Sequence, residues 1–335
     1  MTRTQYGNCP ITIVTGFLGA GKTTLLRQLL ERAEFSETAL IINEVGEAVV
    51  DQLLFGEKRV APIILAGGCI CCTLVEDIGY TLRDLHERRA QGLIPPFKRV
   101  VIETTGLADP GPLVTRLLTD GWIGDRFSLG LVITVADATN IGRTVSVSPE
   151  AAVQIALADR VVISKADLVD EAATAEAIAH IVKVNPTAQV IKADRGDVPS
   201  DAFLAARSSG AMATPAAHSH HHAAGIETAS MKISQPLVWS RAARALDVMF
   251  ARHRDRLLRL KGVLNIEGCP KPVSVNGVQG VFYPPELLAS WNQMERGSRV
   301  VVIARDADPR AMLGELRERL GSMPDQINLV SEGTL

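Results

Sequence analysis

The chain has 335 residues, more than one compact core usually holds, so its length predicts about two domains. Hydrophobic residues make up 47% and charged residues 21%, a globular composition that excludes wholesale disorder. Lys plus Arg is 35 and Asp plus Glu is 37, a formal net charge of -2, so no overall field favours nucleic acid or an anionic membrane as a partner.

The N-terminus and the cysteines indicate a compartment. No stretch approaches the roughly 18 consecutive apolar residues of a spanning helix, and residues 1–10 lack the apolar region of a signal peptide. Five cysteines are an odd number, and three of them crowd together, unlike a secreted disulfide framework. The sequence therefore predicts a cytoplasmic protein with no membrane partner, in which the isolated Cys9 and Cys269 are structural.

Short runs rich in Val and Ile alternate with helix-like stretches from residue 11 to about residue 194. Several runs are continuously apolar, as expected of a mainly parallel sheet with helices on both faces. This pattern predicts a doubly wound α/β domain over residues 9–195. The predicted strands are 11–15, 39–43, 60–65, 99–104, 129–135, 160–164 and 189–192.

The pattern changes after this domain. Residues 196–228 are rich in Ala, Ser, Gly, Pro and His and predict a linker, and residues 229–325 predict a smaller α+β domain. Its predicted elements are a helix at 240–259, strands at 260–266, 273–283 and 299–304, and a helix at 308–320. A basic stretch predicts a solvated helix face, with a docking surface as the alternative. It comprises Arg241, Arg244, Arg252, Arg254, Arg256, Arg259 and Lys261.

A glycine-rich segment follows the first predicted strand directly. Residues 16–23 read Gly-Phe-Leu-Gly-Ala-Gly-Lys-Thr and precede a helix-like run at 24–32. Such glycines let backbone N–H groups turn inward around phosphate oxygens, and the start of a helix adds partial positive charge. A chance glycine-rich turn would need neither flanking element. We expect Lys22 to reach the β- and γ-phosphates and Thr23 to bind Mg²⁺. The predicted nucleotide contacts here are Gly16, Gly19, Ala20, Gly21, Lys22, Thr23 and Thr24.

The predicted strand at 99–104 carries an acidic residue at its end. After a phosphate loop, Glu103 at this position is expected to hold Mg²⁺ through water, and the Gly106 N–H to sense the γ-phosphate. Without that context, the same pattern is typical of a strand that ends at the surface.

The segment after the strand at 160–164 predicts the base. Asp167 can accept hydrogen bonds from both N1–H and the exocyclic amine of guanine, an arrangement that adenine does not offer, and the stem of Lys165 can lie against the ring. Ser164 stands where such a signature usually has Asn, so we expect one bracing side-chain amide to be missing. These residues favour GTP over ATP.

Three thiols lie within four residues after the predicted strand at 60–65. Cys69, Cys71 and Cys72 follow two glycines, and clustered thiolates bind zinc, cobalt or cuprous copper. A redox pair is disfavoured because the spacing is not Cys-x-x-Cys and a Cys71–Cys72 disulfide would be strained. Packing as small apolar side chains is the other alternative. The candidates for a fourth metal ligand are Glu44, Glu47 and His86.

Two further segments carry candidate ligands. Residues 42–51 are acidic, which is typical of a switch loop near a metal ion but also of a solvated turn; Asp51 is predicted to bind or position Mg²⁺. A histidine run in the predicted linker has the chemistry to capture a metal transiently, or is simply a polar linker. Its members are His218, His220, His221 and His222.

Together these motifs resemble the CobW-type family of metal-linked P-loop GTPases. The shared order is GFLGAGKTT, an Asn-Glu-x-Gly-Glu segment with a following Asp, GGCICC, ETTGLADP and SKAD. Residues 259–262, Arg-Leu-Lys-Gly, and Trp291 are similar to the C-terminal half of that family. Val45 and Val49 depart from it, since the family usually has an aromatic residue and Gly there.

The resemblance implies a slow GTPase that couples its nucleotide state to the binding of zinc or cobalt and delivers the metal to a client metalloprotein. It implies metal binding by Cys69, Cys71 and Cys72, and GTP binding with Mg²⁺ at the loops described above. The acidic segment itself offers Glu44 or Glu47 to join the thiolates. The predicted catalytic residues are Lys22, Glu103 and Asp51. A sensor or store with a structural zinc is the alternative, a small-molecule kinase is disfavoured, and a homodimer stays open.

Overall fold

A computed structural model describes residues 9–42, 62–64, 72–194, 196–204, 225–291 and 296–321, with the backbone alone at 62–64 and 72–77. The chain divides into two compact units. One comprises residues 1–144, 158–178 and 188–208, and the other comprises residues 145–157, 179–187 and 209–335. Within the described residues, no helix is both long and apolar enough to cross a membrane.

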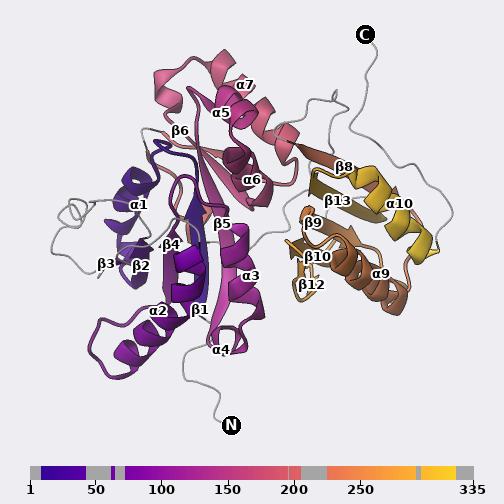
Figure 1. Ribbon diagram of the computed structural model, residues 1–335, viewed down its shortest axis with the longest axis horizontal. Coiled ribbons are helices and arrows are strands. Elements are labelled where there is room, and N and C mark those ends of the chain that lie inside the picture. Colours follow the sequence, from indigo (N-terminus) through magenta and orange to yellow (C-terminus); the bar gives the residue numbers. More distant parts are fainter. Residues whose placement is uncertain are drawn as a thin grey trace. The chain divides into compact units, whose positions relative to one another are not determined.

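A parallel sheet forms the centre of the first unit (Figure 1). Its described strands run in the order β3-β2-β4-β1-β5-β6-β7, and each neighbouring pair is parallel. Every residue of β2 and β6 is buried, which requires cover on both faces and confirms the predicted doubly wound α/β class. The strands are β1 (Cys9–Thr15), β2 (Thr38–Ile42), β3 (Pro62–Ile64), β4 (Arg99–Glu103), β5 (Phe127–Asp137), β6 (Arg160–Ser164) and β7 (Gln189–Lys192).

Helices connect these strands. The longer ones are α1 (Lys22–Leu30), α2 (Cys72–Ala90), α3 (Gly111–Thr119), α5 (Ile141–Val147), α6 (Pro149–Leu157) and α7 (Glu171–Val184). The short ones are η1 (Ala33–Phe35), α4 (Gly121–Gly124), η3 (Ala166–Leu168) and α8 (Asp201–Leu204). By contact, α6 and the end of α7 belong to the second unit, although the sequence places them between strands of the first.

The predicted linker differs from the structure at its start. Helix α8 lies within the span 196–228, and Phe203 is 5% exposed. Its ring meets Phe35 edge to face, with centroids 6.4 Å apart. An aromatic side chain stabilises the fold by such burial, so this part of the chain packs onto the core.

An antiparallel sheet with two helices forms most of the second unit (Figure 1). Its described strands run β11-β10-β9-β13-β8, and β12 pairs with β10. They are β8 (Ile226–Ile233), β9 (Leu257–Leu264), β10 (Val273–Val278), β11 (Val281–Phe282), β12 (Glu286–Leu287) and β13 (Ser298–Arg305). Helices α9 (Trp239–Arg252) and α10 (Pro309–Leu320) pack together and bury Leu246, Met249, Leu313 and Leu316.

Two predictions for this unit were wrong, and one strand was missed. The helix predicted to reach residue 259 ends at Arg252, because residues 257–264 form β9 between β10 and β13. The single strand predicted at 273–283 is two strands, separated by a turn in which Gln279 and Gly280 have φ of 44° and 76°. Strand β8 was not predicted, and its first three residues, 226–228, fall in the supposed linker.

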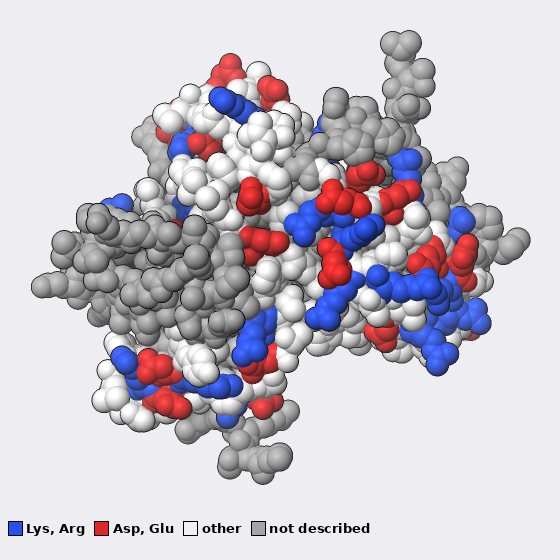
Figure 2. Space-filling view, viewed as in Figure 1, with Lys and Arg blue, Asp and Glu red and all other residues white. Residues whose placement is uncertain are grey.

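The basic stretch divides between surface and core. Arg241, Arg244 and Arg252 are exposed on α9, in the predicted solvated face, and Figure 2 shows basic side chains gathered over α9 and α10. Arg259 is 1% exposed in β9, so the prediction of a solvated face was wrong there.

Buried Arg259 holds the end of a helix. Its Nη1 donates a hydrogen bond to the carbonyl of Leu157, the last residue of α6. Nearby in the same unit, Lys261 Nζ lies 3.1 Å from Thr187 O, and Thr228 Oγ1 lies 3.0 Å from Val184 O, the last residue of α7. A helix C-terminus carries partial negative charge, so the Arg259 guanidinium stabilises the end of α6.

The Arg259→Ala variant tests this contact. Because the change leaves a cavity and a buried carbonyl without its donor, we expect the free energy of unfolding to fall by about 2–3 kcal/mol. Urea unfolding followed by tryptophan fluorescence measures it. The matched control is Arg256→Ala, since Arg256 is exposed; equal midpoints for the two variants would contradict the assignment.

Glu315 links α10 to the C-terminal end of α9. It accepts hydrogen bonds from His253 Nε2 at 3.0 Å, from Arg319 Nη2 at 3.0 Å and from Arg252. The His253 bond, ahead of those from Arg252 and Arg319, lowers the pKa of Glu315 from 4.5 to about 2.

This lowered pKa predicts a pH dependence. The unfolded chain protonates Glu315 first, so its contribution to stability is complete above about pH 5 and is lost as the pH falls towards about 2. We expect the denaturant midpoint of unfolding to depend less on pH over that range in Glu315→Gln than in the unmodified chain. Glu318→Gln, on the exposed side of the same helix, should retain the slope of the unmodified chain; the same flattening in this control would argue against Glu315 as the source.

Candidate nucleotide-binding site

The glycine-rich loop joins β1 to α1 at the carboxyl edge of the parallel sheet. Gly16, Gly19 and Gly21 have φ of 143°, 72° and 91°, in the region that favours glycine. A Cβ on Gly16 would lie 2.2 Å from the carbonyl oxygen of Val135, so no other residue lets the loop leave β1 this close to β5. The loop therefore has the backbone that a phosphate cradle requires.

Lys22 is held inside this loop. Its side chain is buried, and its Nζ donates to Gly16 O at 2.7 Å and to Phe17 O at 3.3 Å. The ammonium group thus lies against the loop backbone, where the motif requires it for phosphates.

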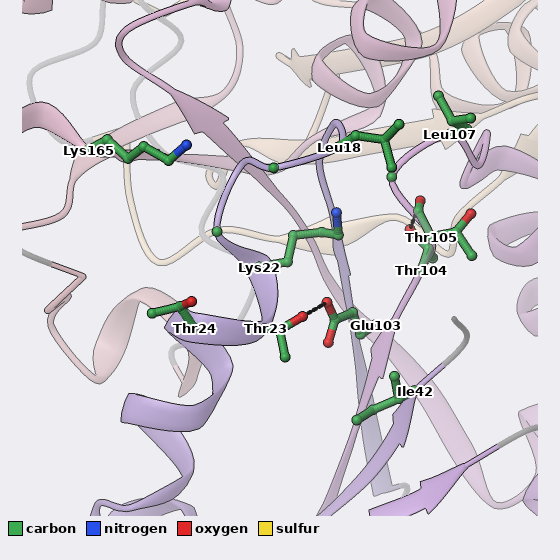
Figure 3. A pocket seen from close by; sticks show the side chains of 13 residues that line it. Leu18, Lys22, Thr23, Thr24, Ile42, Glu103, Thr104, Thr105, Leu107 and Lys165 are labelled. Atoms are coloured by element: carbon green, nitrogen blue, oxygen red, sulfur yellow. Dashed lines mark hydrogen bonds between the residues drawn. The ribbon is translucent and has the colours of Figure 1, made fainter. Parts of the chain in front are cut away.

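Thr23 and Glu103 meet beside the loop. Parallel pairing places Val14 of β1 opposite Glu103 of β4, and Thr23 Oγ1 donates to Glu103 Oε1 at 2.8 Å (Figure 3). Glu103 is 4% exposed. A hydroxyl and a carboxylate are the oxygen ligands that Mg²⁺ prefers, so the residues predicted for this ion fit it chemically.

A cavity of about 610 Å³ opens over these residues, a size typical of small-molecule sites. Of the predicted residues, it is lined by Gly19, Gly21, Lys22, Thr23, Thr24, Glu103, Gly106 and Lys165. Sequence reasoning missed Leu18, Ile42, Thr104, Thr105 and Leu107. Thr104 and Thr105 had a signal, because they directly follow the acidic end of a buried strand.

The loop after β6 is tied to the phosphate loop. Ser164 Oγ donates to Ala20 O at 2.6 Å. With serine at this position the side-chain amide is missing, as expected, but the loop is still braced because the short hydroxyl of Ser164 spans the gap. Lys165 reaches the cavity from a left-handed backbone, with φ of 56°, and Asp167 is exposed two residues later in η3.

Asp137 was not predicted. It ends β5, opposite Ser164 of β6, and its Oδ2 lies 2.7 Å from Lys165 Nζ. The signal was the one that identified Glu103, an acidic residue closing an apolar strand.

Most predicted transition-metal ligands lie outside the described residues. These are Glu44, Glu47, Cys69, Cys71, His218, His220, His221 and His222, and Asp51, predicted for Mg²⁺, lies outside them as well. Cys72 is the first residue of α2, where the backbone alone is described.

His86 does not fit the role of fourth ligand beside Cys72. It lies 14 residues further along α2, from residue 72 to residue 86, which corresponds to about 21 Å of helix. Its ring contacts Trp122 and Phe127, with centroids 5.7 and 6.4 Å away. Burial, then the charges of Arg89 and Arg126, lowers the pKa of His86, as expected for a neutral packed ring.

Comparison with known proteins identifies the family. Residues 10–192 match the model of the CobW/HypB/UreG nucleotide-binding domain, and residues 226–320 match that of the cobalamin synthesis protein cobW C-terminal domain. The chain belongs to the CobW/HypB/UreG family. This membership confirms the predicted class, a P-loop GTPase of the CobW type whose nucleotide is GTP.

Relatives within the CobW/HypB/UreG family span nearly the whole chain. The zinc chaperone YjiA of Escherichia coli is 32% identical over 88% of this chain and 93% of its own length. The zinc chaperone CobW of Pseudomonas aeruginosa is 33% identical over 93% of this chain and 91% of its own. A zinc-bound crystal structure of the E. coli YjiA GTPase matches with a TM-score of 0.70 at 26% identity, covering 93% of this chain and 99% of that one.

The Ser164 brace yields a prediction for this CobW-type site. In Ser164→Ala the buried Ala20 carbonyl loses its donor, so we expect the Kd for GDP to rise about fivefold, the value of one hydrogen bond. Titration with a fluorescent GDP analogue measures it. Ser164→Thr keeps the hydroxyl and should bind close to normally; an unchanged Kd in the alanine variant would show that the brace does not matter.

Proposed function

We propose that this chain is a GTP-dependent zinc metallochaperone. In this proposal Cys69, Cys71 and Cys72 bind the zinc cargo, with Glu44 or Glu47 completing the site, and a client metalloprotein receives it. The relatives named zinc chaperones support the choice of metal. The observation that carries the proposal is that β3, the strand directly before the cysteine segment, ends two strands away from Glu103 of the nucleotide site.

The cysteine segment starts close to the nucleotide site. Ile64, the last residue of β3, pairs with Ile42 of β2, which pairs with Glu103 of β4. Two strand spacings separate Ile64 from Glu103, about 10 Å. Residues 65–71 connect this strand end to the start of α2 at Cys72. A movement of the backbone at Glu103 can therefore reach the cysteine segment through the pairing of β4, β2 and β3.

The chain's own residues divide the work on GTP. The N–H groups of residues 16–21 surround the phosphates, and Lys22 exchanges its carbonyl partners for phosphate oxygens. Thr23 and Glu103 would hold Mg²⁺, with Asp51 positioning it, and the ion would supply charge neutralisation at the phosphates. Thr24 and Gly106 complete the phosphate contacts.

The base lies against a second group of residues. Asp167 accepts from guanine, the Lys165 stem lies along the ring, and Ser164 keeps this loop fixed to the phosphate loop through Ala20.

Close packing provides a route for the nucleotide signal. A Cβ on Gly106 would lie 2.7 Å from Leu18 N, so the turn after β4 lies directly on the phosphate loop. Loss of the γ-phosphate alters this contact, and Ile42 on the same cavity leads into the acidic segment of Glu44 and Glu47. Gating requires that zinc binds the GTP and GDP states with different affinity.

Other features stay predictions. They are cobalt as cargo, the homodimer, the absence of nucleic-acid and membrane partners, the cytoplasmic location, and the division into 9–195, 196–228 and 229–325. A sensor or store with a structural zinc is the competing function.

Zinc affinity in two nucleotide states tests the proposal. We expect the Kd for zinc, from competition with a chromogenic chelator, to differ at least tenfold between protein with GDP and protein with a non-hydrolysable GTP analogue and Mg²⁺. The difference should vanish in Cys71→Ser.

Cys269→Ser is the matched control, because Cys269 lies in the second unit and contacts Lys271 O. It should keep the nucleotide-dependent difference. Equal zinc affinity in both states would contradict gated delivery and favour the sensor or store.

A further inference from the structure

We infer that Asp137 is a positioning residue for the guanine base, because its carboxylate holds Lys165 as a fixed wall of the base site. The inference rests on the proposed function, in which the Lys165 stem lies against the base. Neither the family match nor the relatives assign a role to this residue.

Three donors occupy the Asp137 carboxylate. Lys165 Nζ lies 2.7 Å from Oδ2, while Thr139 N and Thr139 Oγ1 lie 2.9 and 2.7 Å from Oδ1. The side chain of Asp137 is 15% exposed and that of Lys165 is 36% exposed. Partial burial makes this ion pair stronger than one at the open surface, where such pairs contribute little.

The sheet fixes the pair in place. Asp137 and Ser164 are opposite residues of β5 and β6, and Ala138 N donates to Ser164 O at 3.0 Å. Both partners of the ion pair therefore extend from neighbouring strand ends. Ser164 also contacts the phosphate loop at Ala20, so the same strand end aligns the base site with the phosphate site.

Lys165 needs an anchor for its role. Its backbone is left-handed, with φ of 56° and ψ of 23°, which is costly for a residue other than glycine. A free lysine side chain also has many rotamers, and ordering it against a base costs entropy. Asp137 removes that freedom before the nucleotide arrives. Burial raises the pKa of Asp137, but the hydrogen bonds from Lys165 and Thr139 lower it by more. The pKa is therefore below its usual value, which keeps the carboxylate charged.

Lys165 lies away from the phosphate and Mg²⁺ residues, so a change in its position should affect binding of the base and not binding of the phosphates. Figure 3 shows Lys165 at the side of the cavity away from Thr23 and Glu103. Loss of its anchor should weaken contacts to the base and leave contacts to the phosphates intact.

The test compares two ligands on the full chain. Asp137→Asn keeps an acceptor for Thr139 N but presents a neutral group to Lys165. We expect its Kd for GDP to rise about tenfold, the size of a charge-assisted hydrogen bond, and its Kd for magnesium tripolyphosphate to change less than twofold. Displacement of a fluorescent GDP analogue measures both.

Two further variants isolate the pair. Thr139→Ser keeps both donors to the Asp137 carboxylate and leaves Lys165 in place, and should bind GDP within twofold of the unmodified chain. In a Lys165→Ala background, Asp137→Asn should cause no further loss. The inference is overturned by an unchanged GDP affinity in Asp137→Asn, by equal losses for GDP and tripolyphosphate, or by additive losses in the double variant.

Asp167→Asn separates failure of this inference from failure of the proposed base site. An asparagine can donate to the second carbonyl of xanthine, so this variant should lose GDP and gain xanthosine diphosphate. If Asp167→Asn binds GDP normally, the base site is assigned wrongly. If it switches base while Asp137→Asn binds GDP normally, only the role of Asp137 is refuted.

Discussion

Parallel pairing of β4, β1, β5 and β6 is the constraint on which the whole site depends. It sets Glu103 beside the end of β1 and Asp137 opposite Ser164, so the ends of these strands meet at one carboxyl edge. Ligands of open α/β sheets bind at such an edge, where the strand order changes direction. Here that change occurs at β1, from which the phosphate loop extends. A slip in any one register would separate the phosphate, ion and base contacts.

Short contacts join the phosphate loop to the turn after β4 and to the loop after β6. The phosphate loop receives Ser164 at Ala20 and lies against Gly106 at Leu18, while Lys165 is fixed to Asp137. The Ser164 and Gly106 contacts both reach the phosphate loop, so a shift of this loop acts on the turns after β4 and β6. A nucleotide that moves the phosphate loop therefore affects both turns, which is the property that a switch needs.

Sequence reasoning predicted what short-range chemistry determines. The phosphate loop at residues 16–21 and the acidic end of β4 can each be identified from a few adjacent residues. The parallel fold is predicted by the continuously apolar runs. The boundary between α9 and β9 was beyond such reasoning, because residues 253–259 become turn and strand only through pairing with β10 and β13. The burial of Arg259 likewise depends on a helix end about 100 residues earlier, a distance that local patterns do not report. Cys69 and Cys71, two of the three cysteines proposed to bind zinc, lie outside the described residues.

Helix α6 is buried on all sides from residue 151 to its end. Each of its residues from Ala151 to Leu157 is buried, so the helix has no solvated side, and its end is held by Arg259 of β9. Yet α6 lies within the span matched as nucleotide-binding domain, while its contacts group it with the C-terminal sheet. A helix buried on every side requires neighbours on every side. A chain ending at residue 195 would lack β8 and β9, which α6 contacts, and would expose side chains that are buried in the full chain.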